Sequence, residues 1–367
     1  MEKLGKYIQE YTVKNKCAED IPVYSVTNTQ GFCKDYFGKE VASKDKTTYK
    51  IVPKGYFAYN PSRINVGSVD WQRNEERVIV SPLYNVFSVS EQLHQQYLYY
   101  YLKSDIVRQF IKVIARGTVR DNLKLSMLCE FPIYVPSVLE QENIVVKLDG
   151  LQKVIKLRKQ QLQKLDELIQ ARFVEMFGDP RTNPLDFEKQ MLKLTCKVIT
   201  GNTPSRAVAE YYGNYVEWIK TDNIVAGLLN PTKAVECLSK KGTEVGRIVK
   251  KDSILMVCIA GSIASIGRVC IVDRTVAFNQ QINAVITGGK YNIIFLYVLL
   301  QISKDYLIED INMALKGILS KSKLEKKEFI IPPIELQNQF ADFVNQVHKS
   351  KLVIKNLLQI YKHQIQM

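Results

Sequence analysis

The chain has little of what metal sites, disulfide frameworks and membrane spans require. Its 367 residues include three histidines and seven cysteines, and the cysteines are scattered without a Cys-x-x-Cys pair. Such usage predicts reduced, mostly buried thiols, with Cys258 and Cys270 in the core, and argues against a zinc site. No apolar run approaches the roughly 18 residues of a membrane span. The opening segment Met1–Lys6 has no apolar signal core. We therefore expect a cytoplasmic protein without a metal centre.

The motifs of three common enzyme classes are also missing. An adenine methyltransferase needs an Asn/Asp-Pro-Pro-Tyr/Phe loop, and the nearest candidate, Asn60–Arg63, lacks the second proline and the aromatic residue. The segment Gly288–Lys290 lacks the upstream glycine and the following Ser/Thr of a phosphate-binding loop. Glu188 and Glu325 lie in ordinary charge runs and form no nuclease carboxylate cluster. These absences favour a chain without catalytic chemistry of its own.

What the chain does have is positive charge and ample core material. Fifty-one Lys and Arg residues against 37 Asp and Glu give a net charge of +14. This excess favours a polyanionic partner such as nucleic acid. The alternative is a lysine-rich composition that reflects an A/T-rich genome. Hydrophobic residues make up 46% of the chain, and its length suggests two or three domains.

The chain repeats itself once, at an offset of about 194 to 200 residues. The matched segments are 22–28 with 216–222, 51–55 with 248–252, 62–67 with 262–267, 97–99 with 295–297, and 136–141 with 332–337. Each repeat is too long for a solenoid unit. The pattern therefore predicts a duplicated globular domain, each copy followed by a helix.

Each predicted helix carries an apolar seam whose steps alternate between four and three residues. The seam positions are Ile144, Leu148, Leu151, Ile155, Leu162, Leu165 and Ile169 in the first helix, and Phe340, Val344, Val347, Ile354, Leu358, Tyr361 and Ile365 in the second. This spacing predicts that the two helices pair as a coiled coil. Basic residues interrupt the seams at Arg158 and Lys351, where we expect them to extend toward solvent. The alternative is two amphipathic helices docked on separate cores.

The first long helix has recognisable ends. A capping box at Ser137 and Glu140 marks its start, and the segment Gly178–Pro180 marks its end. From Ile144 to Met176 such a helix measures about 48 Å at 1.5 Å per residue. That length exceeds one turn of B-DNA, roughly 34 Å.

The fold class predicted is α/β (α+β): two globular domains in tandem, separated by two long helices that pair as an antiparallel coiled coil. The predicted boundaries are 1–135, 136–180 (helix), 181–330 and 331–367 (helix). Strand-like runs are expected at 23–27, 49–52, 56–59, 78–80, 83–87, 216–220, 254–259, 268–272 and 283–286. Helices are expected after a second capping box at Ser88 and Glu91, continuing to Leu102, and near Ile293–Gln301.

The arrangement resembles the specificity subunits of type I restriction–modification systems over essentially the whole chain. Segments 135–144 and 331–340 look like that family's central and C-terminal conserved regions. Segments 200–206, 217–221, 261–267 and 279–282 look like a target-recognition domain. The first half departs more, with 26–32, 60–63 and 81–82 at the equivalent places.

The resemblance implies a division of labour. Each globular domain would read one half of a split site in double-stranded DNA, mainly through the major groove, and the helix pair would set the gap. Modification subunits that carry the S-adenosylmethionine chemistry, two of them, would bind this chain, and a motor–nuclease restriction subunit would join for cleavage. No cofactor is expected in this chain itself.

Candidate DNA contacts are polar and basic residues in predicted loops, because base edges are read by Arg, Asn and Gln, and phosphates by Lys, Arg, Ser and Thr. They are Asn60, Ser62, Arg63, Asn65, Arg73, Arg120, Thr203, Ser205, Arg206, Lys220, Ser262, Ser265, Arg268, Gln280, Gln281 and Lys316. For each, the alternative is an ordinary turn or surface residue, and Gln280 and Gln281 could instead satisfy buried backbone groups. Gly67 and Gly267 are expected to serve backbone geometry.

Two other classes of protein remain open from the residues alone. A nuclease or methyltransferase with unrecognised motifs would bind S-adenosylmethionine or show activity as the isolated chain. An assembly protein that uses the coiled coil for protein contacts would show no salt-dependent affinity for DNA, whereas neutralising phosphates gives a steep salt dependence.

Overall fold

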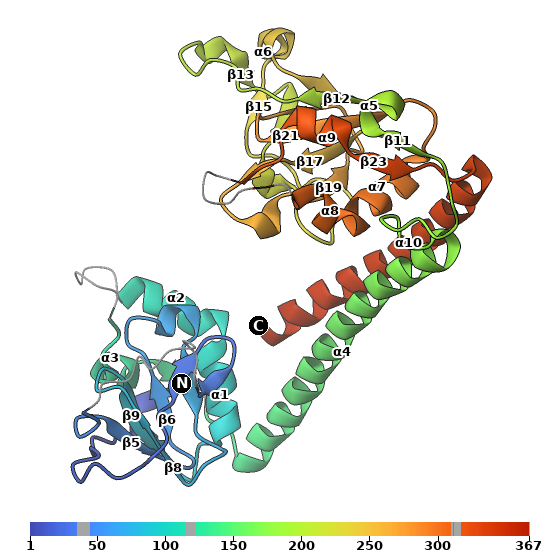
Figure 1. The fold of residues 1–367 in the computed structure, drawn as a ribbon. Helices are drawn as coiled ribbons and strands as arrows, with labels where there is room; N and C mark the ends of the chain where they lie inside the picture. Colours follow the sequence, from blue (N-terminus) through green and yellow to red (C-terminus); the bar gives the residue numbers. More distant parts are fainter. Residues whose placement is uncertain (35–44, 115–121, 310, 312–316, 367) are drawn as a thin grey trace. The chain divides into compact units, whose positions relative to one another are not determined.

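The computed structural model describes residues 1–34, 45–114, 122–309, 311 and 317–366. The chain forms two compact units: unit 1 comprises Met1–Gln160 and Lys355–Met367, and unit 2 comprises Gln161–Ile354. Each unit therefore holds one globular region and a part of both long helices. Strands and helices mix in both, as the predicted fold class requires (Figure 1). Among the described residues, none of the helices combines the length and the apolar character that crossing a bilayer demands.

Unit 1 is built on an antiparallel sheet with the strand order β2-β9-β6-β7. Its strands are β1 (Glu2–Lys3), β2 (Ile8–Glu10), β3 (Ser25–Thr27), β4 (Gly31–Cys33), β5 (Lys50–Pro53), β6 (Phe57–Tyr59), β7 (Val69–Trp71), β8 (Arg77–Val80), β9 (Asn85–Val89) and β10 (Pro132–Ile133). Its short helices are η1 (Leu4–Lys6), η2 (Ile64–Val66), α1 (Gln95–Lys103), α2 (Asp105–Ile114) and α3 (Leu125–Cys129). Phe57 and Phe87 stack in the core with ring centroids 5.2 Å apart, beneath α1, α2 and α3.

Unit 2 contains a sheet of the same kind, with the strand order β12-β21-β17-β19. Its strands are β11 (Lys189–Met191), β12 (Cys196–Thr200), β13 (Tyr212–Gly213), β14 (Val216–Ile219), β15 (Cys237–Leu238), β16 (Ile248–Val249), β17 (Ile254–Val257), β18 (Ile259–Ala260), β19 (Val269–Ile271), β20 (Val276–Phe278), β21 (Ile282–Thr287), β22 (Gly317–Ile318) and β23 (Glu328–Ile330). Its short helices are α5 (Leu192–Thr195), η3 (Ala209–Tyr211), η4 (Thr221–Asn223), α6 (Lys240–Val245), η5 (Ile263–Ser265), α7 (Ile293–Ile302), α8 (Lys304–Ile308) and α9 (Lys321–Lys326). The repeat seen in the sequence is therefore also a repeat of sheet topology.

The two units differ outside this shared sheet. In unit 2 a second sheet has the order β13-β15-β14-β20-β16, in which β14 and β20 run parallel. In unit 1 the corresponding region holds two two-stranded sheets, β3-β4 and β5-β8. Part of this second sheet also recurs in unit 1, because Val23 and Ile79 form a parallel bridge and β5 pairs with β8 as β16 pairs with β20. The outer sheets differ in the remaining strands, β13 and β15 in unit 2 and β3 and β4 in unit 1.

One predicted helix start was wrong. Ser88 does not cap a helix, because it lies in β9 and pairs with Gln9 of β2. Helix α1 begins at Gln95, and its N-cap is His94, whose side chain accepts a hydrogen bond from the backbone of Gln96 at 3.2 Å. The Ser-x-x-Glu pattern alone did not distinguish a strand edge from a cap.

The two long helices are α4 (Val138–Phe177) and α10 (Ile334–Gln366). At the start of α4 the hydroxyl of Ser137 accepts a hydrogen bond from the backbone of Glu140 at 3.3 Å, as the capping pattern predicted. The helix stops before Gly178, which has a φ of +69°. Within unit 2 the helices lie side by side (Figure 1). Phe340 near the start of α10 contacts Phe173 near the end of α4, so the pair is antiparallel.

The seam positions lie on the less exposed faces of both helices. Ile169, Phe340, Val344, Val347, Ile354 and Leu358 are buried, and Ile144, Leu148, Leu151, Ile155, Leu162, Leu165 and Tyr361 are half-buried. The side chain of Ile365 falls outside the described residues. Phe340 also packs against Phe295 of α7, with ring centroids 6.3 Å apart. In unit 2 the helices consequently pair with each other and dock on the globular core at the same time.

Lys351 corrects the expectation that basic seam residues extend toward solvent. Its side chain is 5% exposed and forms an ion pair with Asp166 of α4. Asp166, at 50% exposure, supplies the carboxylate from the helix surface. The ammonium group can stay in the seam because it has a partner of opposite charge there.

A buried glutamine fastens α4 to the globular region of unit 1. Gln141 is fully buried, and its amide makes three hydrogen bonds. Its Oε1 accepts from the backbone of His94, and its Nε2 donates to the carbonyls of Gln92 and Pro136, all at 2.8 Å. Because His94 is the N-cap of α1, these bonds tie the first turn of α4 to the start of α1.

The same joint occurs in unit 2. Gln337 is also fully buried. Its Oε1 accepts from the backbone of Asn292, the N-cap of α7, at 2.9 Å, and its Nε2 donates to the carbonyls of Lys290 and Pro332 at 3.2 and 2.8 Å. Gln141 and Gln337 are the final residues of the repeated segments 136–141 and 332–337. The repeated motif therefore encodes one joint between a long helix and its domain, used twice.

Candidate nucleic-acid interface

Two of the candidate contacts in unit 2, Arg206 and Lys220, lie near the end of β14. The guanidinium carbon of Arg206 lies 4.3 Å from the ring centroid of Tyr212 and 5.3 Å from that of Trp218, and the Lys220 ammonium lies 5.0 Å from the Trp218 centroid. Arg206 and Lys220 both form ion pairs with Glu236. We call these five residues the Trp218 cluster. It presents two cations on an aromatic surface, an arrangement suited to contacts with phosphates and bases.

Other candidates lie in the loop that follows β12 and in the loop that precedes β21. Thr203 donates a hydrogen bond to the side chain of Gln280, so these two exposed residues are brought together. The side chain of Gln281 accepts from Asn279 at 3.1 Å. Ser205 is exposed in the same loop as Thr203. These side chains carry free donor and acceptor positions at the surface, which is what reading a base edge needs.

A second group occupies the loop between β18 and β19. Ser262 is exposed, Ser265 is half-buried, and the Nε of Arg268 donates to the carbonyl of Ser265 at 3.2 Å. The ammonium group of Lys304 donates to the carbonyl of Ala264 at 2.7 Å and so holds this loop from α8. Gly267 ends the loop with a φ of +77°, which agrees with its predicted role in backbone geometry.

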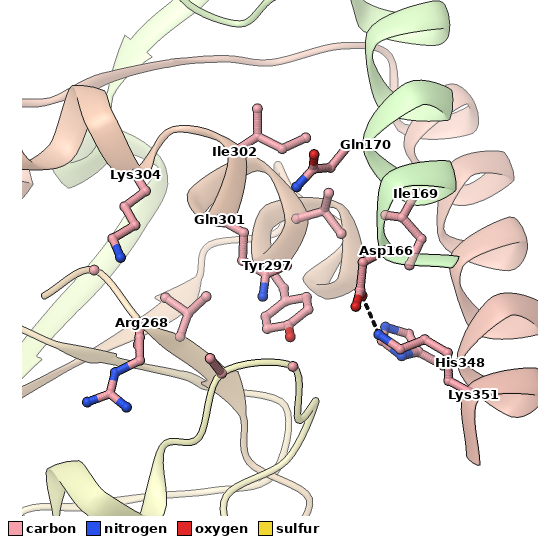
Figure 2. Close-up of a pocket in the computed structure, with 15 residues that line it drawn as sticks. Asp166, Ile169, Gln170, Arg268, Tyr297, Gln301, Ile302, Lys304, His348 and Lys351 are labelled. Carbon is pink, nitrogen blue, oxygen red and sulfur yellow. Dashed lines mark hydrogen bonds and ion pairs between the residues drawn. The ribbon is translucent and has the colours of Figure 1, made fainter. Parts of the chain in front are cut away.

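Arg268 faces a cavity of about 270 Å³ inside unit 2. Figure 2 shows Arg268 and Lys304 on one side of this cavity and the Asp166–Lys351 ion pair, with His348, on the other. Arg268 is half-buried, whereas Arg206 is exposed.

In unit 1 the loop after β6 gathers four of the candidates. Asn60 is half-buried, and its side chain accepts hydrogen bonds from the backbone and hydroxyl of Ser62 at 3.1 and 2.9 Å. Ser62 and Arg63 are exposed and Asn65 is half-buried. Lys103 holds this loop by donating to the carbonyl of Gly67 at 2.5 Å, as Lys304 holds the loop of unit 2. Gly67, with a φ of +91°, serves backbone geometry as predicted.

Arg73 lies in a separate cluster of unit 1. Its guanidinium carbon is 4.5 Å from the ring centroid of Trp71 and 5.6 Å from that of Tyr99, and it pairs with Asp70 at 2.8 Å. The remaining candidates, Arg120 and Lys316, lie outside the described residues.

Glu236 and Asp70, the two carboxylates that hold these cations and which we call the acidic anchors, have pKa values shifted in opposite directions. Hydrogen bonds from Lys220 and Arg206 lower the pKa of Glu236, so it remains ionised at neutral pH. Burial raises the pKa of Asp70 above its usual value. The charge of Arg73 and hydrogen bonds from the backbone of Trp71 and Phe32 lower this pKa, but by less than burial raises it. Each carboxylate therefore positions a cation over an aromatic ring, one at the surface and the other from the interior.

The structure contains no group of His, Cys, Asp and Glu side chains arranged to hold a metal ion within the residues it describes. The prediction of mostly buried thiols was wrong, since Cys17 is exposed and three further cysteines are half-buried: Cys33, Cys129 and Cys237. Cys258 and Cys270 are buried as predicted, and burial raises the pKa of both thiols to about 12. Neither thiol has the exposure or the acidity that nucleophilic chemistry needs.

Sequence reasoning missed the residues that support the candidate contacts. Glu236, Asp70, Lys103 and Lys304 were not among the candidates, although each holds one of them or the loop that carries it. Their signal in the sequence is weak, because an isolated charged residue beside a strand has the appearance of ordinary surface. Only the pairing of strands brings Glu236 next to Trp218, whose backbone donates to the Glu236 carbonyl at 2.9 Å.

Comparison with known proteins agrees with this architecture. A family model described as the type I restriction modification DNA specificity domain matches residues 3–167 and again residues 184–360. The type I restriction enzyme MjaIX specificity subunit of Methanocaldococcus jannaschii is 26% identical over 336 residues, which cover 85% of this chain and 74% of that protein. The HindI specificity subunit of Haemophilus influenzae is 28% identical over 174 residues, which cover 46% of this chain and 37% of that protein.

Solved structures share the fold. A chain from a study of complex assembly and conformational transition of the type I R-M system aligns with a TM-score of 0.63 at 16% identity, covering 99% of this chain and 94% of that one. The type I restriction-modification S subunit from M. genitalium aligns with a TM-score of 0.53 at 12% identity, covering 100% and 94%. At these identities the likeness concerns the fold.

The two tandem matches to this domain model place the chain in a class of DNA specificity subunits. The chain belongs to the type I restriction modification DNA specificity family. It is a non-catalytic specificity subunit of a type I restriction–modification system, as the resemblance in its sequence implied.

Proposed function

We propose that this chain reads a two-part site in double-stranded DNA, with one target-recognition domain for each half-site. Residues 1–135 form the first of these domains and residues 181–330 the second. The helices at 136–180 and 331–367 set the gap between the half-sites. The observation that carries the proposal is the duplication itself, since two globular regions with the same central sheet each bear exposed basic and amide side chains.

The chemistry of the candidate residues fits this role. Arg63, Arg73 and Arg206 can donate two hydrogen bonds to the edge of a guanine, and Asn or Gln side chains can pair with adenine. Ser and Lys residues in the same loops suit phosphate oxygens. The divergent outer sheets place different side chains at the surface of the two units, which suits two different half-sites.

The partners follow from family membership. We propose that two modification subunits bind this chain and carry the S-adenosylmethionine chemistry, and that a motor–nuclease restriction subunit joins for cleavage. The chain itself holds no cofactor in this scheme. Because the substrate is cellular DNA, the proposed location is the cytoplasm.

Co-expression tests the proposal. The chain is expressed with the gene neighbour that carries an Asn/Asp-Pro-Pro-Tyr/Phe motif, and methylated positions are mapped across the host genome. We expect a split motif with a fixed gap that disappears when this chain is deleted. A stable complex with no methylated motif would favour an assembly protein, and methylation by the neighbour alone with the same motif would contradict a specificity role.

Exchange of one domain tests independent reading. Residues 181–328 are replaced by the equivalent region of another specificity subunit, and methylation is mapped again. One half-site of the motif should change while the other half-site and the gap stay the same. A change in both half-sites would contradict independent reading by two domains.

A further inference from the structure

Glu236 stands between two cations that sequence analysis marked as DNA contacts. Its Oε2 lies 2.5 Å from the Nη2 of Arg206, and its Oε1 pairs with the Nζ of Lys220. The two cations come from different segments, Arg206 from the loop after β12 and Lys220 from the end of β14. One carboxylate therefore fixes the relative positions of two cations that are distant in the chain.

The aromatic rings beneath these cations are held by hydrogen bonds and by each other. Trp218 is 3% exposed, and its indole N–H donates to the carbonyl of Asn202 at 3.3 Å. Tyr212 packs against it edge to face with ring centroids 6.0 Å apart, and its hydroxyl donates to the carbonyl of Pro204 at 2.7 Å. We call these two rings the Tyr212–Trp218 wall. Strand pairing places Glu236 beside it, because β15 pairs with β14 and the backbone N–H of Trp218 donates to the Glu236 carbonyl.

The three charged side chains remain within reach of a ligand. Arg206 is 56% exposed, and Lys220 and Glu236 are each 34% exposed. Glu236 is ionised at neutral pH, since both cations hold the pKa of its carboxyl below the usual range. The three side chains together carry a net charge of +1, where the two cations alone would carry +2.

We propose that Glu236 is a specificity-determining residue of the second target-recognition domain, which positions Arg206 and Lys220 on the Tyr212–Trp218 wall and restrains their attraction to phosphates of any sequence. This inference rests on the proposed function and adds a residue that acts through the two cations.

The physical basis is a competition between one carboxylate and the DNA backbone. Sequence-independent affinity grows with the number of phosphates that basic residues neutralise. A cation already paired with Glu236 gains less from a phosphate than an unpaired one. For Arg206 the gain in binding free energy is largest where the DNA also offers a base edge that its guanidinium can reach in the position set by Glu236. Such bidentate contacts are geometrically specific.

Binding of the full chain to a random-sequence DNA duplex, measured over a range of salt concentrations, tests the restraint. In Glu236→Gln the side chain keeps its shape and loses its charge. We expect its affinity at low salt to rise about fivefold, the effect of one exposed ion pair of about 1 kcal/mol. The plot of log affinity against log salt should steepen by about 0.9, the contribution of one more neutralised phosphate.

Glu210→Gln is the matched control. Glu210 pairs with Lys241 in the same unit, and this pair is more exposed than the Glu236 pairs. The control changes the net charge by the same amount as Glu236→Gln. We expect it to leave the slope near that of the unchanged protein, because Lys241 is not among the candidate DNA contacts. Adding Arg206→Ala to Glu236→Gln should remove part of the gain, because Arg206 is one of the two cations released and Lys220 remains.

The outcomes separate this inference from the proposed function. If the unchanged chain shows no salt-dependent binding, the proposed function fails and the inference fails with it. If it binds and Glu236→Gln matches Glu210→Gln, only the inference is overturned. Weaker binding by Glu236→Gln would also overturn it, since the carboxylate would then contribute to the contact with DNA.

Methylation mapping with the modification subunit gives a second readout that general destabilisation would not produce. We expect Glu236→Gln to relax the base preference of one half-site and to leave the other half-site and the gap unchanged. An unaltered motif, or equal relaxation of both half-sites, would overturn the assignment of Glu236 to specificity.

Discussion

The two units of this chain have kept the same joint and changed the surface around it. Gln141 and Gln337 make equivalent sets of hydrogen bonds, each to the N-cap backbone of the first domain helix and to two carbonyls. In both units a carboxylate holds cations over aromatic rings, but the two arrangements differ. The buried Asp70 holds Arg73. The partly exposed Glu236 holds Arg206 and Lys220. The two units thus share the way a domain is attached to its helix and differ in the side chains that the domain presents at its surface.

The comparison also separates the two long helices. Phe340 of α10 is fully buried among the rings of Phe173, Phe177 and Phe295, while its counterpart in the first repeat, Ile144 of α4, is half-buried. The start of α10 is therefore anchored by an aromatic core.

The largest effect should come from removing that aromatic anchor. Phe340→Ala should lower the free energy of unfolding by about 3–5 kcal/mol, because it opens a cavity in a closed core. Ile144→Ala, at the equivalent position, should cost about 1 kcal/mol, since the side chain is already partly exposed. Urea denaturation of both variants measures the difference. Equal losses would show that the two helix starts are packed alike.

The two joints should respond equally. Gln141→Met and Gln337→Met each remove three hydrogen bonds and leave buried backbone groups without their partners. We expect each to lose about 2–3 kcal/mol in the free energy of unfolding. Thermal and urea denaturation of the two variants would show this. A loss in one unit alone would contradict the equivalence of the joints.

Lys351 offers a smaller test, because its counterpart in the first repeat is the apolar Ile155. Asp166→Asn leaves a buried ammonium without its counter-charge. It should cost about 1–2 kcal/mol, less than for a fully buried pair because Asp166 is half exposed. Lys351→Met removes the charge as well and should be close to neutral. Should Lys351→Met prove the more damaging of the two, the ion pair would be a net stabilising feature of the seam.

Substitutions of the acidic anchors Asp70 and Glu236 should have the smallest effects on the free energy of unfolding. The two effects should change with pH in opposite directions. Burial raises the pKa of Asp70, so as pH falls toward its titration range the folded state binds a proton before the unfolded chain does. The unchanged protein should then gain stability relative to Asp70→Asn. The pKa of Glu236 is lowered by Lys220 and Arg206, so the unchanged protein should lose stability relative to Glu236→Gln as pH falls through that range. Urea denaturation between pH 7 and pH 3 tests both signs, and parallel pH trends would remove the distinction between the anchors.

Much of the fold could be predicted from periodicity and repetition. Short β-rich runs bounded by Gly, Pro, Asn and Asp placed β6, β8, β14, β17 and β21 close to their observed bounds, and the helix expected near 293–301 matched α7. The steps of four and three residues identified the less exposed faces of α4 and α10. These features are local or repeat at a constant offset, so they are visible in a single sequence.

The candidate site was less accessible to sequence reasoning. Loop position indicated Arg206, Lys220 and Arg73 as candidates, but their acidic partners belong to other segments and are brought near only by folding. Glu236 reaches Lys220 through the pairing of β14 with β15. The burial of Lys351 had the same cause, because the heptad pattern did not show that Asp166, outside the seam on α4, lies within reach.

We propose that the two domains read separate half-sites at a distance set by the helices, and this distance can be changed by lengthening a helix. Four residues inserted after Leu157 add about 6 Å and just over one helical turn. The insertion point lies beside Leu157, whose side chain is 53% exposed and outside the apolar seam. Methylation mapping with the modification subunit should show both half-sites unchanged and the gap longer by about two base pairs, at roughly 3.4 Å each. A methylated motif with its original gap would contradict the claim.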